Sequence, residues 1–160
     1  MREYLLVLLA TAFITYLTTP IARYAALRFG FMAKVRDRDV HDRPIPRLGG
    51  LAMVAGLLAG LSLASQLPLI SNVFNDGSQI RALLAGAGIL VLLGVIDDKW
   101  SIDGPVKLAG QTIAAAVMAS QGISLIWLPL PFVQGTLSLD PLTGVLLTVL
   151  IVLITVNAVN

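Results

Sequence analysis

Residues 82–99 read ALLAGAGILVLLGVIDDK, an apolar run that ends in two adjacent carboxylates, Asp97 and Asp98. Two neighbouring negative charges repel each other, and at the C-terminal end of a helix they also meet the negative end of the backbone dipole. Such a pair favours a bound cation, and Mg²⁺ is commonly held by one or two carboxylates together with waters and substrate phosphates. The alternative is a polar helix end that faces water, and this stretch alone leaves both interpretations open.

The composition is that of an integral membrane protein. Of the 160 residues, 57% are hydrophobic and 12% are charged, and the mean hydropathy is +0.88. The charged fraction is about half that of a soluble domain. The chain has no cysteine, which excludes disulfides and thiolate metal sites within these residues. Its few basic residues are not interleaved with aromatic ones, so nucleic-acid binding has no support.

Five apolar segments predict an all-α fold, a polytopic transmembrane helical bundle. A helix needs about 20 apolar residues to cross the hydrocarbon core, and the predicted spans are residues 4–27, 48–67, 80–96, 106–128 and 142–159. The first apolar run continues past the point where a signal peptide would be cleaved, so we expect it to be retained as a span. The segment between the fourth and fifth spans has room for a small hairpin.

Lysine and arginine are concentrated in alternate loops. Residues 28–47 hold several basic side chains, and Lys99 and Lys107 lie between the third and fourth spans, whereas the other two loops have none. The positive-inside rule therefore places the N-terminus outside and loops 28–47 and 97–105 in the cytoplasm. We expect a multi-pass protein of the cell membrane with its chemistry on the cytoplasmic side.

The first basic loop ends in HDRPIPRLGG, residues 41–50. Its prolines favour an extended backbone, which delivers Arg47 to the start of the second span. Gly49 and Gly50 open that helix, so an anion could approach the free backbone N–H groups closely. His41 is the single histidine of the chain. A basic loop that only fixes the topology is the simpler alternative for this segment.

Two further groups of polar residues lie on the same predicted side. The fourth span begins near Pro105 with Lys107, and Gln111 follows one turn later on the same helix face. The sequence closes with Asn157-Ala-Val-Asn160, whose two amides share one face and would either join helices or contact a ligand. Two basic helix N-termini and one carboxylate pair predict a metal–diphosphate site at the inner membrane surface. A Walker A loop is absent from the sequence, which argues against an ordinary nucleotide-driven motor.

Together these motifs resemble those of the polyprenyl-phosphate N-acetylhexosamine-1-phosphate transferases, glycosyltransferase family 4. Residues 41–50 are similar to the first cytoplasmic motif of that family. Asp97-Asp98 followed by Lys107 and Gln111 resembles the second, and residues 157–160 resemble the start of the third. The order, spacing and sidedness agree over about residues 30–160. The Pro-Ile-Pro-Arg form is nearer to the branch that moves N-acetylglucosamine-1-phosphate onto the lipid.

The resemblance implies an enzyme that transfers N-acetylglucosamine-1-phosphate from UDP-N-acetylglucosamine to an undecaprenyl or decaprenyl phosphate. UMP would be released, and a lipid-linked cell-envelope glycan would be started. The implied metal is Mg²⁺, or alternatively Mn²⁺, at Asp97 and Asp98. One of these two residues would act on the lipid phosphate, and which one is left open. The implied substrate contacts are His41, Arg47, Gly49, Gly50, Lys107, Asn157 and Asn160.

The family has about ten or eleven spans, and this sequence stops inside the third motif. It therefore resembles the N-terminal part of a single membrane-embedded transferase domain, which we expect to be inactive alone. A homodimer is left open. The alternative from another class is an ion-coupled transporter or carrier that uses Asp97 and Asp98. The predicted position of the pair at the membrane surface argues against a carrier, whose sites usually lie near the bilayer midplane.

Overall fold

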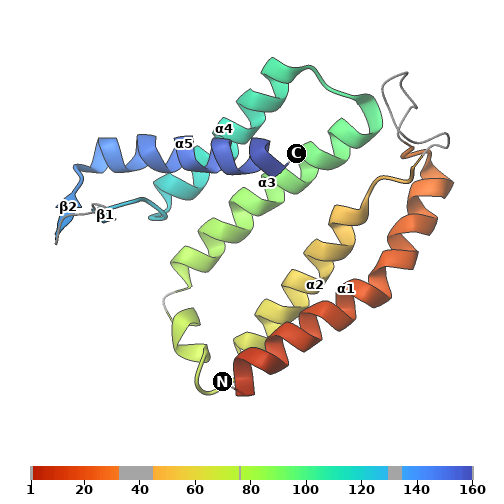
Figure 1. Cartoon of the computed structure of the whole chain (residues 1–160), viewed down its shortest axis with the longest axis horizontal. Helices are drawn as coiled ribbons and strands as arrows, with labels where there is room; N and C mark the ends of the chain where they lie inside the picture. The colour runs from red at the N-terminus through yellow and green to blue at the C-terminus, as the bar shows by residue number, and fades with distance from the viewer. Residues whose placement is uncertain (1, 33–44, 76, 130–134, 160) are drawn as a thin grey trace. The chain divides into compact units, whose positions relative to one another are not determined.

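The computed structural model describes residues 2–32, 45–75, 77–129 and 135–159. This part of the chain contains five α-helices and one short hairpin (Figure 1). Contacts divide the chain into two compact units, of which the first comprises Met1–Asp76 and Gly94–Ser101, and the second Gly77–Leu93 and Ile102–Asn160. In chain order the elements are α1 (Arg2–Phe29), α2 (Gly49–Ala64), the 3-10 helix η1 (Ser71–Phe74), α3 (Ser78–Trp100), α4 (Gly104–Ser120), β1 (Trp127–Pro129), β2 (Thr136–Ser138) and α5 (Pro141–Val159).

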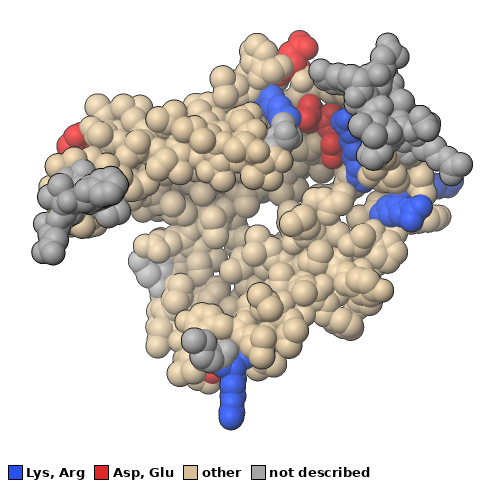
Figure 2. Space-filling view, in the orientation of Figure 1, with Lys and Arg blue, Asp and Glu red and all other residues tan. Residues whose placement is uncertain are grey.

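Three of the described helices, α1, α3 and α5, are long and apolar enough to cross a membrane. Helices α2 and α4 have 16 and 17 residues, fewer than the roughly 20 that span the hydrocarbon core. Much of the surface visible in Figure 2 is uncharged, as expected of helices that face lipid. The all-α polytopic membrane fold is confirmed, while the count of five spans stays a prediction.

In the first unit, α1 and α2 lie side by side and run in opposite directions (Figure 1). Helix α2 buries one stripe of small residues, Ala52, Gly56, Gly60 and Ala64, which recur every four positions. This spacing keeps them on one helix face, and Gly56 and Gly60 lie against threonines of α1. These two glycines allow α1 and α2 to pack closely, because helix backbones approach each other where side chains are absent.

The second unit is built on α3 as far as Leu93 and on α4 and α5. Gly86 of α3 faces Met118 of α4, and Gly110 of α4 faces Leu93 of α3. Helix α5 packs against α4. The buried residues of α4 are Gln111, Ala114, Ala115 and Ala119, so its inner face is small and mostly apolar, with one amide.

Helix α4 ends earlier than the predicted fourth span. The predicted span extends to residue 128, but the helix stops at Ser120. Gly122 has a φ of 98°, and the N–H of Ile123 donates to the carbonyl of Met118 at 3.1 Å. This is the glycine-based Schellman ending, which satisfies the last carbonyls of a helix. The segment with room for a small hairpin contains one, which begins within the predicted span: β1 pairs with β2 in antiparallel register, Leu128 opposite Leu137.

Candidate active site

The carboxylate pair lies in the last turn of α3. The helix ends at Trp100, and the next residue, Ser101, has a left-handed φ of 51°. The Ser101 N–H donates to the carbonyl of Asp97 at 2.8 Å, which is the single-bond form of the left-handed helix ending. The negative end of the helix therefore lies beside Asp97 and Asp98, as the sequence predicts. Neighbouring helical residues point about 100° apart, so the two carboxylates face different directions.

Backbone pairing delivers Arg47 to this turn. Met32 and Pro46 form an antiparallel bridge, and the N–H of Arg47 donates to the carbonyl of Phe31 at 2.9 Å. These bonds join the end of α1 to the start of α2. Leu48, which is buried, then turns the chain into α2 with a φ of 73°, a conformation that a residue with a side chain adopts only at a cost.

The result is an ion pair between two motifs that are far apart in the sequence. Nη1 of Arg47 lies 3.7 Å from Oδ1 of Asp98, and the two side chains are 34% and 32% exposed. An ion pair exposed to this degree contributes about 0–1 kcal/mol to stability. Opening this ion pair therefore costs little free energy. The contact matters because it places the guanidinium of Arg47 beside the carboxylate pair.

Lys99 adds a second positive charge to the same turn. Its Nζ lies 5.0 Å from the ring centroid of Phe31 and 5.6 Å from that of Trp100. A lysine over aromatic faces is held by the ring quadrupole. We name Asp97, Asp98, Arg47 and Lys99 together the α3 charge cluster. It balances two negative and two positive side chains within the first unit.

The glycines that follow Arg47 are open to approach. Gly49 and Gly50 are the first residues of α2 and are exposed. A Cβ added at either position would meet nothing within 4 Å. The first N–H groups of a helix have no partner inside the helix, so this backbone can accept an anion beside Arg47.

The remaining predicted residues lie in the second unit or outside the described chain. Nδ2 of Asn157 in α5 donates to Oε1 of Gln111 in α4 at 2.7 Å. Lys107 lies four residues before Gln111 on the same helix, in the turn that follows Asp103. His41 and Asn160 fall outside the described residues. The structure thus joins Arg47 to Asp98 in one unit and Asn157 to Gln111 in the other.

The two carboxylates of the α3 charge cluster are oxygen ligands of the kind that a hard divalent cation prefers. Within the described ranges, no three His, Cys, Asp or Glu residues come together. The protein ligands offered here are therefore the two carboxylates of Asp97 and Asp98. Mg²⁺ is commonly bound through one or two carboxylates while waters and phosphates complete its shell.

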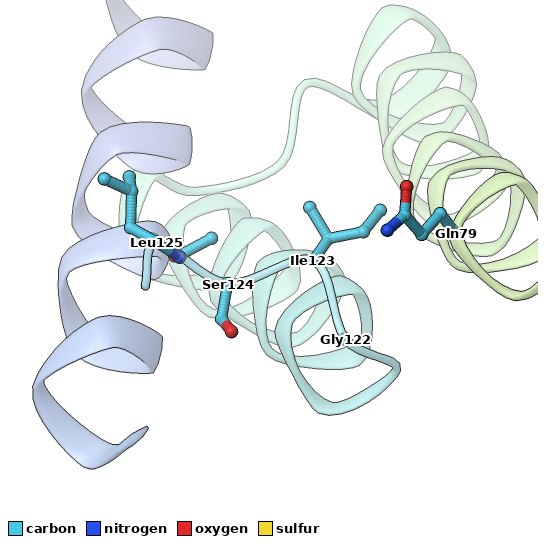
Figure 3. A pocket seen from close by; sticks show the side chains of 6 residues that line it. Gln79, Gly122, Ile123, Ser124 and Leu125 are labelled. Carbon is cyan, nitrogen blue, oxygen red and sulfur yellow. The ribbon is translucent and has the colours of Figure 1, made fainter. Parts of the chain in front are cut away.

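A separate cavity of about 320 Å³ lies in the second unit (Figure 3). Gly122, Ile123, Ser124 and Leu125 form one wall, and Gln79 faces Ile123. Leu125 is held in place because its N–H donates to Oγ1 of Thr148 at 2.8 Å. The described residues that line the cavity carry no charge, so it does not suit a diphosphate or a metal.

Comparison with known proteins places these motifs in a family. The sequence description of Glycosyl transferase family 4 matches residues 80–160, which is half of the chain and includes the carboxylate pair, Lys107 and Asn157. The chain belongs to this family. The resemblance inferred from the three motifs is therefore confirmed at the level of the family.

Curated relatives agree with this membership. The chain is 41% identical over its whole length to the decaprenyl-phosphate N-acetylglucosaminephosphotransferase of Mycolicibacterium smegmatis and 42% identical to that of Mycobacterium leprae. A probable undecaprenyl-phosphate N-acetylglucosaminyl 1-phosphate transferase of Bacillus subtilis is 32% identical over 89% of the chain. The chain spans 40%, 40% and 37% of the length of these three relatives. No solved structure matches the chain at a significant level.

Sequence reasoning missed several residues that lie in or beside the candidate site. In the sequence, Phe31 and Leu48 are ordinary apolar residues. In the structure, the ring of Phe31 contacts Lys99 and its carbonyl accepts a bond from the N–H of Arg47. Leu48 directs the chain into α2. For Gln111, the sequence indicates only that it shares a helix face with Lys107. The available signal was an amide inside an otherwise apolar span, because a buried amide requires a hydrogen-bond partner.

Proposed function

We propose that the whole protein transfers N-acetylglucosamine-1-phosphate from UDP-N-acetylglucosamine to a polyprenyl phosphate and releases UMP. The observation that carries the proposal is the contact between Arg47 and Asp98. It joins the phosphate-binding features at the start of α2 to the carboxylates that end α3. The relatives named above are polyprenyl-phosphate N-acetylglucosamine phosphotransferases by name, which favours this function over an ion-coupled carrier.

The reaction is a displacement at phosphorus. An oxygen of the lipid phosphate attacks the phosphorus nearest the sugar, and the bond from that phosphorus to the bridging oxygen breaks. UMP leaves with the electron pair of that bond, and the sugar-1-phosphate becomes part of a polyprenyl diphosphate. Phosphoryl transfers of this type depend mainly on positioning and on charge stabilisation.

The described residues supply both of these contributions. Asp97 and Asp98 would hold the metal and would approach the lipid phosphate, with the two roles left unassigned. When bound, Mg²⁺ would neutralise negative charge on the diphosphate. Because the ion pair of Arg47 is weak, its guanidinium can turn from Asp98 to a phosphate oxygen. The N–H groups of Gly49 and Gly50 follow shortly after Arg47 and can donate hydrogen bonds to a second phosphate oxygen.

Lys107 and Asn157 complete the proposed substrate contacts, together with His41 and Asn160. Lys107 carries a positive charge in the early turns of α4, where the helix dipole also favours an anion. The motif order agrees with the family, whose description covers these residues of the second unit. We assign Lys107 to a phosphate and Asn157 to the lining of the same pocket.

The proposal is tested by UMP release from the full-length protein in detergent, with and without Mg²⁺. Asp97→Asn and Asp98→Asn should each lower the rate by about a hundredfold or more, the effect of removing a charge-stabilising group from a reaction centre. Asp103→Asn is the matched control, because Asp103 is exposed and makes no side-chain capping bond. Its rate should equal the wild type. Thermal stability of Asp98→Asn should hardly change, since the lost ion pair is weak.

Two outcomes would contradict the proposal. The first is well-folded protein that gives no UMP with any UDP-N-acetylhexosamine. The second is an equal loss of rate in Asp98→Asn and Asp103→Asn, which would mean that general surface charge and not the carboxylate pair matters.

We further propose that the α3 charge cluster lies at the cytoplasmic face of the cell membrane. The support is the concentration of lysine and arginine in loops 28–47 and 97–105. Because residues 1–160 contain no cysteine, single cysteines can report the orientation. Asn72→Cys in η1 should react with a membrane-impermeant maleimide in intact cells, whereas Ser101→Cys should react only after lysis. The reverse pattern would invert the topology.

A further inference from the structure

Gln111 is the one large side chain that is completely buried in the described part of the chain. It is 1% exposed, and it lies on the inner face of α4 among alanines. Burying an amide costs free energy unless its polar atoms are hydrogen-bonded. A buried amide therefore requires a hydrogen-bond partner, and the partner of Gln111 is Asn157.

The carboxamide of Asn157 is held by two acceptors. Its Nδ2 donates to Oε1 of Gln111 at 2.7 Å and to the backbone carbonyl of Leu153 at 2.8 Å. The carbonyl of Leu153 can only accept, so the atom facing it must be the NH₂ group of Asn157. The neighbouring atom of Gln111 is then fixed as its oxygen, because an NH₂ group there would face another NH₂ group.

This orientation leaves one edge of Asn157 for a ligand. Both N–H bonds point to Gln111 and Leu153, and the planar amide therefore directs Oδ1 away from them. Asn157 itself is exposed. An amide oxygen only accepts, so it can bind an N–H group, an O–H group or a cation. Without Gln111 the amide could rotate and present its NH₂ group instead.

We propose that Gln111 is a positioning residue, which locks Asn157 so that Oδ1 faces an electropositive group of the substrate. The inference rests on the proposed function and names the polarity of the group that Asn157 binds. Two sources supply that chemistry: the metal ion on the diphosphate, or the N–H and O–H groups of the sugar–nucleotide. Gln111 acts through Asn157 and does not touch the substrate.

The test uses the full-length enzyme and the variant Gln111→Met, which keeps the length of the side chain and removes its acceptor. We expect kcat/KM for UDP-N-acetylglucosamine to fall about fivefold, the equivalent of one neutral hydrogen bond. In the background of Asn157→Ala, Gln111→Met should have no further effect on kcat/KM, because its partner is gone. If Gln111→Met does not fold, Gln111→Asn withdraws the acceptor by one methylene and keeps the amide.

Thr148→Val is the matched control for a merely structural role. Thr148 is 7% exposed and lies on the same helix as Asn157, and its hydroxyl bonds the carbonyl of Gly144 and the N–H of Leu125. This variant should lose thermal stability and keep the wild-type KM. Gln111→Met should lose stability and should also change either KM for UDP-N-acetylglucosamine or the Mg²⁺ concentration of half-maximal activity.

Two titrations distinguish the sources of the electropositive group. If Oδ1 faces the metal, Gln111→Met shifts the Mg²⁺ concentration of half-maximal activity. If Oδ1 faces the sugar–nucleotide, Gln111→Met raises KM for UDP-N-acetylglucosamine at saturating Mg²⁺.

Three outcomes would overturn the inference. If the wild type is active and Gln111→Met lowers the melting temperature but changes neither KM nor the Mg²⁺ requirement, the inference alone is wrong. A wild type that releases no UMP would overturn the proposed function and the inference together. A thermal-unfolding double-mutant cycle that gives additive effects for Gln111→Met and Asn157→Ala would show that the two amides are uncoupled, which also overturns the inference.

Discussion

The close contact between α1 and α2 makes Gly56→Ala a sensitive probe of the first unit. A Cβ at Gly56 would lie 2.7 Å from the backbone oxygen of Thr11 and 3.1 Å from Cβ of Thr15, and it would also meet the Thr15 hydroxyl. A side chain can turn away, but a backbone oxygen cannot. Ordinary contact begins at 3.4 Å, so the helices must separate by 3.4 − 2.7 = 0.7 Å.

The size of the effect follows from two opposing contributions. Overpacking of this kind costs about 1–3 kcal/mol, whereas replacing glycine by alanine inside a helix gains up to about 1 kcal/mol. Gly88→Ala in α3 is the matched control, because an added Cβ there meets nothing within 4 Å. The control isolates the helix gain, so Gly56→Ala should be less stable than Gly88→Ala by about 1–3 kcal/mol.

The measurement is the free energy of unfolding in mixed detergent micelles, followed by helical circular dichroism. Both variants are compared with the wild type in the same micelles. A Gly56→Ala protein as stable as Gly88→Ala would refute the reasoning, because it would mean that α2 does not present this stripe to α1.

Two further predictions concern the ends of helices. Ser101→Gly should stabilise the protein by about 1 kcal/mol, because glycine adopts the left-handed φ of 51° without a Cβ penalty, whereas Ser101→Ala should not; equal melting temperatures for the two variants would contradict this. Asp140 accepts bonds from the hydroxyl and the N–H of Thr143, and these bonds lower the pKa of its carboxyl from 3.8. The contribution of this cap to stability is therefore complete above the ordinary pKa and is lost as the pH falls through the lowered one. Asp140→Asn keeps a neutral hydrogen-bond acceptor, so the melting temperature of this variant should fall less than that of the wild type as the pH is lowered. An equal fall in both proteins would mean that other groups cause it.

Much of the local structure is predictable from the sequence. The apolar segments indicate helices, and α3 and α5 lie close to two of the predicted spans. The carboxylates end a helix and Gly49 begins one, as their neighbours in the sequence predict. The predicted fourth span is longer than α4 by residues 121–128, and the cause is local. The sequence stays apolar beyond Gly122, although the backbone at Gly122 ends the helix.

The sequence by itself also determines the family, because three motifs in fixed order are specific even where each one is weak. It does not determine which polar side chains meet. Nothing in the spacing of 46 residues pairs Gln111 with Asn157, and nothing in the loop motif directs Arg47 to Asp98 and not to Asp97. Those contacts depend on how helices cross and on backbone turns such as that at Leu48. Hydrophobic periodicity specifies the element, whereas the partner of a polar group is decided only when the elements pack.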